Sequence, residues 1–282
     1  FGTFGIWQRT LVSSLWTAAM KLHTVGFCGV DDTVDLQELM KLNKEFPGWI
    51  EWGVLLRPDK QGSPRYASKE LLIRLGHLAR GEDPELSGSL RLAAHLCGKD
   101  CLRALSGDVQ HIQELHKLLG FRRMQLNPTK ANEASGWAAA AAAANLRKLC
   151  EALPELELIL QVNEETQELF KLLFQGDMPP PANMAVLLDA SCGLGVAPST
   201  WQPPPGLRRF GFAGGLGPST VLPQLEAMHR DCEASYKDAV VWIDMESRIR
   251  SQVNDRDVFD LSLIRSVAEK VAASGWLLKS SL

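Results

Sequence analysis

The chain has 282 residues, of which 45% are hydrophobic and 22% are charged, with 23 glycines and 15 prolines. This composition is typical of a globular protein and excludes a disordered or fibrous chain. The formal net charge is −3, and binding to phosphate backbones requires a basic face, so we expect no nucleic-acid partner. No apolar run approaches the roughly 20 residues that cross a bilayer, so we expect no membrane partner.

The cysteines indicate the compartment. Six in this length are too few for a disulfide scaffold, and the Cys97-x-x-x-Cys101 pair lacks the second pair of a zinc site. We therefore expect a reduced, cytoplasmic protein without a metal. The six are Cys28, Cys97, Cys101, Cys150, Cys192 and Cys232.

The first 20 residues differ from the rest. Arg9 is their only charge, and their apolar positions have the spacing of a helix that packs on a core. We predict a helical N-terminal extension at 1–20 before a domain at 21–282. A targeting segment is the alternative, although no clear cleavage site is visible.

From residue 21 onward, short apolar segments alternate with longer amphipathic ones, at roughly the 30-residue interval of a βα unit. Residues 191–207 hold four prolines and predict a loop in place of a helix. The alanine run at 138–144 predicts a solvent-facing helix. The predicted strands are 21–28, 50–56, 89–96, 121–126, 156–162, 184–190, 208–213 and 239–245. The predicted helices are 33–45, 68–80, 108–119, 134–152, 164–174, 219–232 and 257–273.

Eight strand–helix units predict eight parallel strands with right-handed crossovers. An open sheet could hold eight strands, but this number favours a closed single-domain (β/α)₈ TIM barrel. In such a barrel the chemistry lies where the strands end, which directs attention to the residues that follow each predicted strand.

Two of these residues are suited to proton transfer. Asp189 ends the sixth predicted strand, where partial desolvation raises a carboxyl pKa and favours a general acid; the alternative is a cap for the loop backbone at 191–195. Cys28 ends the first strand and is a candidate base or nucleophile, or else a buried core cysteine. His95, in the third strand, is a further candidate to line the mouth, the end of the barrel at which the strands end.

Glycines and one arginine suggest binding roles. Gly193 and Gly195 follow the sixth strand, and Gly214 and Gly215 follow the seventh, where this fold commonly binds phosphate. Tight turns would also use glycine there. Arg65 follows the second strand and is suited to a carboxylate, or is a solvated loop residue.

These segments, in this order, resemble the phosphoribosylanthranilate isomerase family from about residue 22 to 272. The segment FCGVDD at 27–32 resembles the family motif with the catalytic cysteine. The segment SPRY at 63–66 is the most specific match. Further matches are MQL at 124–126, VLLD at 186–189 with the following CGLG, FAGGLGPSTV at 212–221, and IDMESR at 243–248.

The resemblance implies a cofactor-free Amadori rearrangement of a phosphorylated aminoaldose to an aminoketose. Asp189 would be the acid that opens the sugar ring, and Cys28 the base that takes the proton from C2. Arg65 and Gln125 would bind the substrate. The phosphate would be held by Gly193, Gly195, Gly214, Gly215, Ser247 and Arg248.

Three departures from the family pattern matter. The family has a lysine two residues before its cysteine, and this chain has Gly26, so a thiolate at Cys28 lacks that cation. Asn127-Pro128 replaces His-Gly after the fourth strand. Glu246-Ser247-Arg248 replaces Ser-Ser-Gly, which puts a carboxylate beside the phosphate site unless Arg248 or Arg250 compensates it.

Two hypotheses follow. In the first, the chain is an isomerase that acts on a phosphorylated small molecule, phosphoribosylanthranilate or a related phosphosugar. In the second, it is a divergent relative that binds a phosphorylated metabolite or a protein partner without turnover. The oligomeric state stays open.

Overall fold

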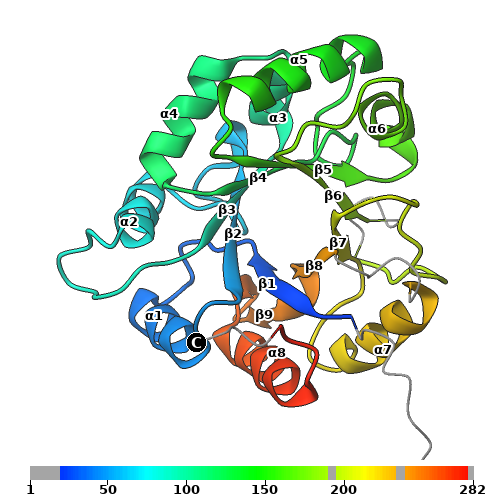
Figure 1. Ribbon diagram of the computed structural model, residues 1–282. Coiled ribbons are helices and arrows are strands. Elements are labelled where there is room, and N and C mark those ends of the chain that lie inside the picture. The colour runs from blue at the N-terminus through cyan, green and yellow to red at the C-terminus, as the bar shows by residue number, and fades with distance from the viewer. Residues whose placement is uncertain (1–19, 190–194, 233–238, 279–282) are drawn as a thin grey trace, which may run out of the picture.

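A computed structural model of the chain describes residues 20–189, 195–232 and 239–278. Eight parallel strands form a closed barrel in chain order, with β1 hydrogen-bonded to β8 and helices around the outside (Figure 1). The predicted (β/α)₈ TIM barrel is confirmed. The strands are β1 (Leu22–Cys28), β2 (Ile50–Leu56), β3 (Leu92–Leu96), β4 (Arg123–Leu126), β5 (Glu157–Val162), β6 (Met184–Leu188), β7 (Arg209–Ala213) and β8 (Val240–Met245).

The helices follow the predicted order, and Asp108 caps one of them as expected, accepting from the His111 N–H. Described residues 195–208 form no helix, in agreement with the proline-rich sequence. The helices are α1 (Leu36–Glu45), α2 (Lys69–Arg80), α3 (Gly98–Leu105), α4 (Val109–Leu119), α5 (Ala139–Ala152), α6 (Gln167–Phe174), α7 (Val221–Cys232) and α8 (Leu261–Ser274).

The barrel interior is packed by pairing large side chains with glycines on the neighbouring strand. A Cβ at Gly211 would collide with the Trp242 ring, and a Cβ at Gly26 would collide with the Asp244 carboxylate. A narrow barrel fills with such alternating large and small residues. Two of the side chains that pack against such glycines, His95 and Asp244, are polar, and this brings ionisable groups into the interior near the strand ends.

Three expectations were wrong in detail. Helix α3 was not predicted. The predicted helix at 257–273 begins only at Leu261, because 256–259 form a strand. In α5 the alanine run is not solvent-facing throughout, since Ala142 and Ala143 are buried.

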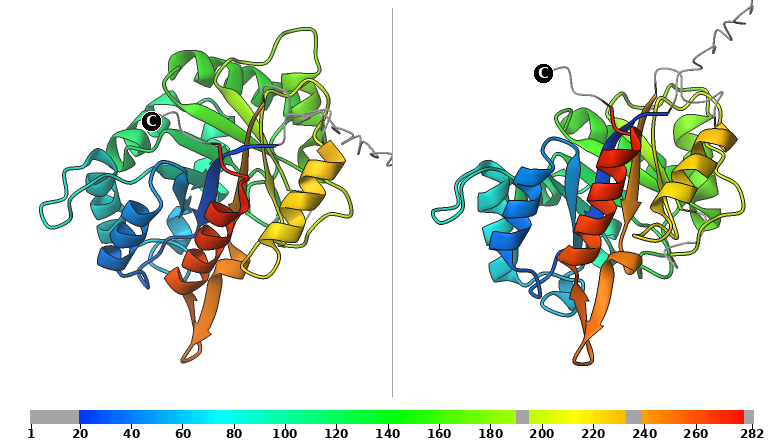
Figure 2. Two further views of the ribbon diagram at one scale, coloured as in Figure 1. Left: turned by 60° about the horizontal axis from the view of Figure 1, so that its bottom comes forward. Right: turned by 90° about the horizontal axis from the view of Figure 1, so that it is seen from below.

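That unexpected strand belongs to a hairpin, β9 (Arg250–Val253) with β10 (Arg256–Phe259), inserted between β8 and α8. It projects from one end of the barrel (Figure 2). Its turn residues Asn254 and Asp255 have φ of 49° and 61°, and positive φ at both residues is what a two-residue hairpin turn of type I′ requires.

The predicted helical extension at 1–20 lies outside the described residues, apart from Met20. No helix in the described part of the chain has the length and hydropathy of a membrane-spanning segment. The cytoplasmic location stays a prediction.

Candidate active site

A cavity of about 230 Å³ opens where the strands end. It gathers nearly every residue that the sequence singled out, from six different strand ends. Gly193 lies outside the described residues. The predicted residues that line the cavity are Cys28, Arg65, Gln125, Asp189, Gly195, Gly214, Gly215, Ser247 and Arg248. Their individual roles stay predictions.

Cys28 lies against a histidine. Its Sγ is 3.3 Å from Nδ1 of His95, and both side chains are buried. Gly53 makes this possible, because a Cβ there would lie 3.0 Å from His95 Nε2 and 2.9 Å from the Cys28 Cα. Burial raises the pKa of Cys28 well above its ordinary value, and the Asp244 and Glu246 carboxylates raise it further. Burial lowers the pKa of His95 to about 4, so at neutral pH a thiol faces a neutral imidazole.

Asp244 continues this arrangement on β8. Its Oδ2 lies 3.6 Å from Nε2 of His95, in the space left by the missing side chain of Gly26. Burial raises the pKa of Asp244 to about 7, and the carboxylate of Asp189 adds to the rise. A carboxyl with this pKa can either donate or accept a proton near neutral pH.

Asp189 lies at the end of β6 and is 5% exposed. Gln161 Nε2 donates to its Oδ2 at 2.7 Å. Most of the loop backbone that Asp189 would cap in the alternative interpretation lies outside the described residues. Gln161 itself is 4% exposed, and its Oε1 accepts no hydrogen bond from any described residue. Gln125 Nε2 donates to Asn127 Oδ1 at 2.9 Å on the neighbouring wall.

The glycines after β7 have a packing reason as well as the predicted one. Gly214 and Gly215 have φ of 113° and 65°. A Cβ on Gly214 would lie 2.6 Å from the carbonyl oxygen of Val196, and one on Gly215 would lie 2.6 Å from the N of Ala197. Two loops therefore meet backbone to backbone at this edge of the cavity.

Arg248 completes that edge. Its exposed side chain packs over Gly217 and makes no ion pair or hydrogen bond with a described residue. Ser247 lies beside Gly195, with Oγ 3.3 Å from the position of a Cβ there. A cation without a carboxylate partner, beside a hydroxyl and two glycines, is an arrangement that can bind phosphate.

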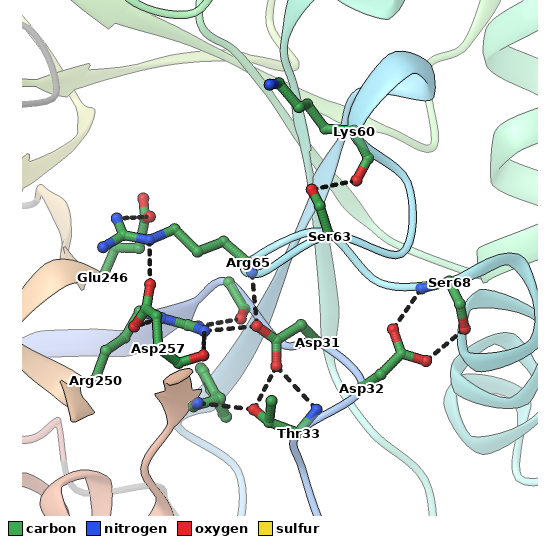
Figure 3. Close-up of polar contacts among 12 residues, drawn as sticks. Asp31, Asp32, Thr33, Lys60, Ser63, Arg65, Ser68, Glu246, Arg250 and Asp257 are labelled. Carbon is green, nitrogen blue, oxygen red and sulfur yellow. Dashed lines mark hydrogen bonds and ion pairs between the residues drawn. The ribbon is translucent and has the colours of Figure 1, made fainter. Parts of the chain in front are cut away.

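Arg65, in contrast, is surrounded by carboxylates (Figure 3). Its Nη1 lies 2.9 Å from Glu246 Oε1, and its Nε lies 2.8 Å from Asp257 Oδ2. Its backbone has φ of 75° and is held by an N–H···Oδ2 bond of 2.6 Å to Asp31. Asp31 and Asp257 also bind Arg250, so an alternating chain of acids and bases joins the hairpin to the loops after β1 and β2.

Arg65 is therefore the partner that compensates Glu246, where the sequence suggested Arg248 or Arg250. Arg65 uses its Nη1 and Nε on the Glu246 and Asp257 carboxylates, and Arg250 is buried against Asp31 and Asp257.

The predicted position of His95 in the lining of the cavity is confirmed, whereas Gln161, Asp244 and Glu246 also line it and were given no chemical role from the sequence. The signal was present for each, because each lies on or directly after a predicted strand end. In the described ranges, no group of three or more His, Cys, Asp and Glu side chains is placed to hold a metal ion.

Neither a known family model nor a curated protein matches this chain. Three solved structures are similar to it. A phosphoribosyl anthranilate isomerase from Thermococcus kodakaraensis matches at 14% identity and a TM-score of 0.46, over 90% of this chain and 100% of that chain. A Rubisco-like protein from Rhodopseudomonas palustris matches at 14% identity and a TM-score of 0.43, over 92% of this chain and 65% of that chain. A putative sugar phosphate isomerase/epimerase from Anabaena variabilis matches at 12% identity and a TM-score of 0.43, over 89% of this chain and 98% of that chain. Likenesses this distant carry no argument about activity.

Proposed function

We propose that this protein is an enzyme that isomerises a phosphorylated aminoaldose to an aminoketose by an Amadori-type rearrangement. The observation that carries the proposal is the convergence on one cavity of proton-transfer groups, Cys28 with His95 and Asp189, and of a cation without a carboxylate partner, Arg248.

The reaction needs an acid first. Asp189 protonates the ring oxygen, the C1–O bond breaks, and the nitrogen lone pair forms the C1=N bond of an iminium ion. The nearby Gln161 Nε2 holds the carboxyl in place throughout. Burial at 5% exposure keeps this proton transfer away from bulk water.

The reaction then needs a base. Cys28 takes the proton from C2, the C–H electrons form the C1=C2 bond, and the C=N electrons return to nitrogen. The enol oxygen then gives its proton to the Asp189 carboxylate and C1 takes a proton back from Cys28, which gives the 1-amino-2-ketose and restores the acid. No redox or organic cofactor takes part.

His95 takes the place of the missing lysine at Gly26 in this scheme. Its Nδ1 accepts the thiol proton as Cys28 becomes the base, and Asp244 stabilises the resulting imidazolium through Nε2–H. The phosphate binds at Arg248, Ser247 and the Gly214–Gly215 loop, and Gln125 contacts the sugar.

The raised pKa of Cys28 favours one alternative. In this alternative the thiol never ionises in the bound complex. The cavity then binds a phosphorylated metabolite without turnover, or the protein binds a protein partner.

Turnover decides between the two. Ribose 5-phosphate is mixed with anthranilate, and product formation is followed by fluorescence; in parallel it is mixed with ammonia, and the aminoketose is followed by NMR. We expect turnover that falls about 10²- to 10⁴-fold in Cys28→Ser and in Asp189→Asn. Cys150→Ser, which removes another buried thiol in α5, is the matched control and should keep its rate. Absence of turnover with both amines, in protein shown to be folded, would leave the binding-only alternative.

A further inference from the structure

The 3₁₀ turn at Ser247–Ile249 contains a cation, Arg248, and directly follows a carboxylate, Glu246. Arg248 packs over Gly217, beside β7. Glu246, two residues earlier, lies over Gly29 beside β1, with Cγ 3.5 Å from the position of a Cβ there. The turn therefore directs a cation to the phosphate end of the cavity and a carboxylate to the end that holds Cys28.

The end that holds Cys28 is acidic. Asp244 and Glu246 line the cavity on the side of β8 and β1, whereas Asp189 lies on the side of β6, with Oδ1 3.8 Å from the position of a Cβ on Gly214. Two arginines lie at this end, and both are bound by carboxylates: Arg65 by Glu246 and Asp257, and Arg250, whose Nη1 also donates to the Gly29 carbonyl, by Asp31 and Asp257. The Asp244 and Glu246 carboxylates are close enough to Cys28 to raise the pKa of its thiol, so the electrostatic potential that they produce at the sulfur is negative.

A second observation points to the ligand. Gln161 is only 4% exposed, and its Oε1 accepts no hydrogen bond from the described residues. A buried acceptor left without a donor costs free energy, so a ligand N–H or O–H is favoured at this position. The cavity of about 230 Å³ is smaller than the roughly 300–1,000 Å³ of pockets for drug-sized ligands, which favours a compact ligand.

We propose that the cavity selects sugar phosphates that carry a basic amine on the carbon remote from the phosphate, and rejects those with a second anionic group there. Glu246 and Asp257 determine this specificity by occupying Arg65. The inference rests on the proposed function and narrows its substrate class: the amine adduct of ribose 5-phosphate with ammonia is preferred over the adduct with anthranilate, which carries a carboxylate.

Three stable probes test the selection by isothermal titration calorimetry. They are 1-amino-1-deoxyribitol 5-phosphate, ribitol 5-phosphate and ribonate 5-phosphate, which share one carbon chain and phosphate and end in an ammonium, a hydroxyl or a carboxylate. We expect affinity to fall in that order, by at least tenfold from the first to the last, or about 1.4 kcal/mol.

Variants locate the cause. Glu246→Gln should reduce the preference for the amine over the carboxylate about tenfold, and Glu246→Gln with Asp257→Asn should reduce it further, because Arg65 is released. Glu38→Gln, on the exposed face of α1, is the matched control and should change nothing. Glu246 is only half-buried at the rim, so the single variant remains informative if thermal unfolding shows that the double variant does not fold.

The outcomes separate this inference from the proposed function. Arg248→Ala should weaken all three probes alike. Equal affinity of the three, or tighter binding of ribonate 5-phosphate, overturns the selection while leaving a phosphate site in place. Absence of binding by all three, or binding that Arg248→Ala does not weaken, overturns the proposed function itself.

Discussion

The two ends of this barrel both hold buried charged groups. At the floor, where the strands begin, these groups are paired, and at the mouth, where the strands end and the cavity opens, they are paired less closely. At the floor, Arg123 Nη1 lies 2.7 Å from Glu51, and its Nε lies 3.4 Å from Glu157. The guanidinium also stacks over the Trp242 ring, 4.1 Å from its centroid. Arg209 pairs with the outer side of Glu157 at 2.7 Å. Each acid at the floor thus has a base.

At the mouth, the nearest partner of Asp244 is His95 at 3.6 Å, and burial keeps that imidazole neutral at pH 7. No arginine or lysine of the described residues lies within ion-pair distance of Asp244. Paired charges hold their ionisation state and serve structure, whereas unpaired ones acquire pKa values suited to proton transfer. One barrel interior therefore has ion-paired carboxylates where the strands begin and a carboxyl with a raised pKa near the positions where they end.

The largest expected effect on stability is at the floor. Arg123→Met leaves Glu51 buried with Arg91 at 3.9 Å as its nearest base, while Glu157 keeps Arg209, and we expect a loss of about 3 kcal/mol in the free energy of unfolding. Denaturant unfolding measures it. Adding Glu51→Leu to the same chain should recover part of the loss. A loss below about 1 kcal/mol for Arg123→Met would mean that the floor charges are no more structural than those at the mouth.

The mouth should respond to pH instead. His95 has its pKa lowered from 6.5 to about 4, so the folded state binds fewer protons and its contribution to stability is lost as pH falls through this range. Asp244 has its pKa raised from 3.8 to about 7, so its contribution is present at low pH and lost as pH rises through that range. At about 1.4 kcal/mol per pH unit, each amounts to about 3–4 kcal/mol.

These two dependences oppose each other and nearly cancel in the parent. Unfolding free energies of the parent, His95→Gln and Asp244→Asn are compared at several pH values between 4 and 7. The free energy of unfolding of the parent should rise with pH relative to that of His95→Gln. Relative to that of Asp244→Asn, it should fall with pH. Differences that do not vary with pH would contradict the unpaired, shifted state of the mouth groups.

A smaller effect tests why β1 has a glycine at position 26. Gly26→Ala brings a Cβ into the Asp244 carboxylate, and such overpacking costs about 1–3 kcal/mol. A double-mutant cycle with Asp244→Ala checks the cause, because the cost should largely disappear in the double variant. An unchanged cost would show that the strain comes from elsewhere in β1.

The sequence predicted the barrel well because its signal is local. Each strand is a short apolar run, and the repeat of the βα unit supplies the count. The hairpin was missed because its cause is not local. Asp257 lies in a segment that resembles a helix start, yet its carboxylate binds Arg65, 192 residues earlier in the chain.

The site shows the same limit. Position at a strand end was enough to select Cys28 and Asp189, because parallel strands in a barrel end at one face. Side-chain pairing was not accessible: Arg65 was predicted from its motif to bind a carboxylate of the substrate, but the carboxylates that it binds are those of Glu246 and Asp257. The contact of Cys28 with His95 depends on Gly53, a residue with no chemistry of its own.

The ion pair between Arg250 and Asp31 spans 219 residues, from the hairpin at the end of β8 to the loop that follows β1. During synthesis the first loop leaves the ribosome long before the arginine is made. Until then Asp31 has no base from the hairpin, and the rim of the cavity cannot take its final charge pattern. The rim therefore gains these ion pairs only after β8 and the hairpin that follows it have been made, and a chain that stops short of the hairpin has Cys28, Asp189 and Asp244 without the ion pairs that Arg250 forms.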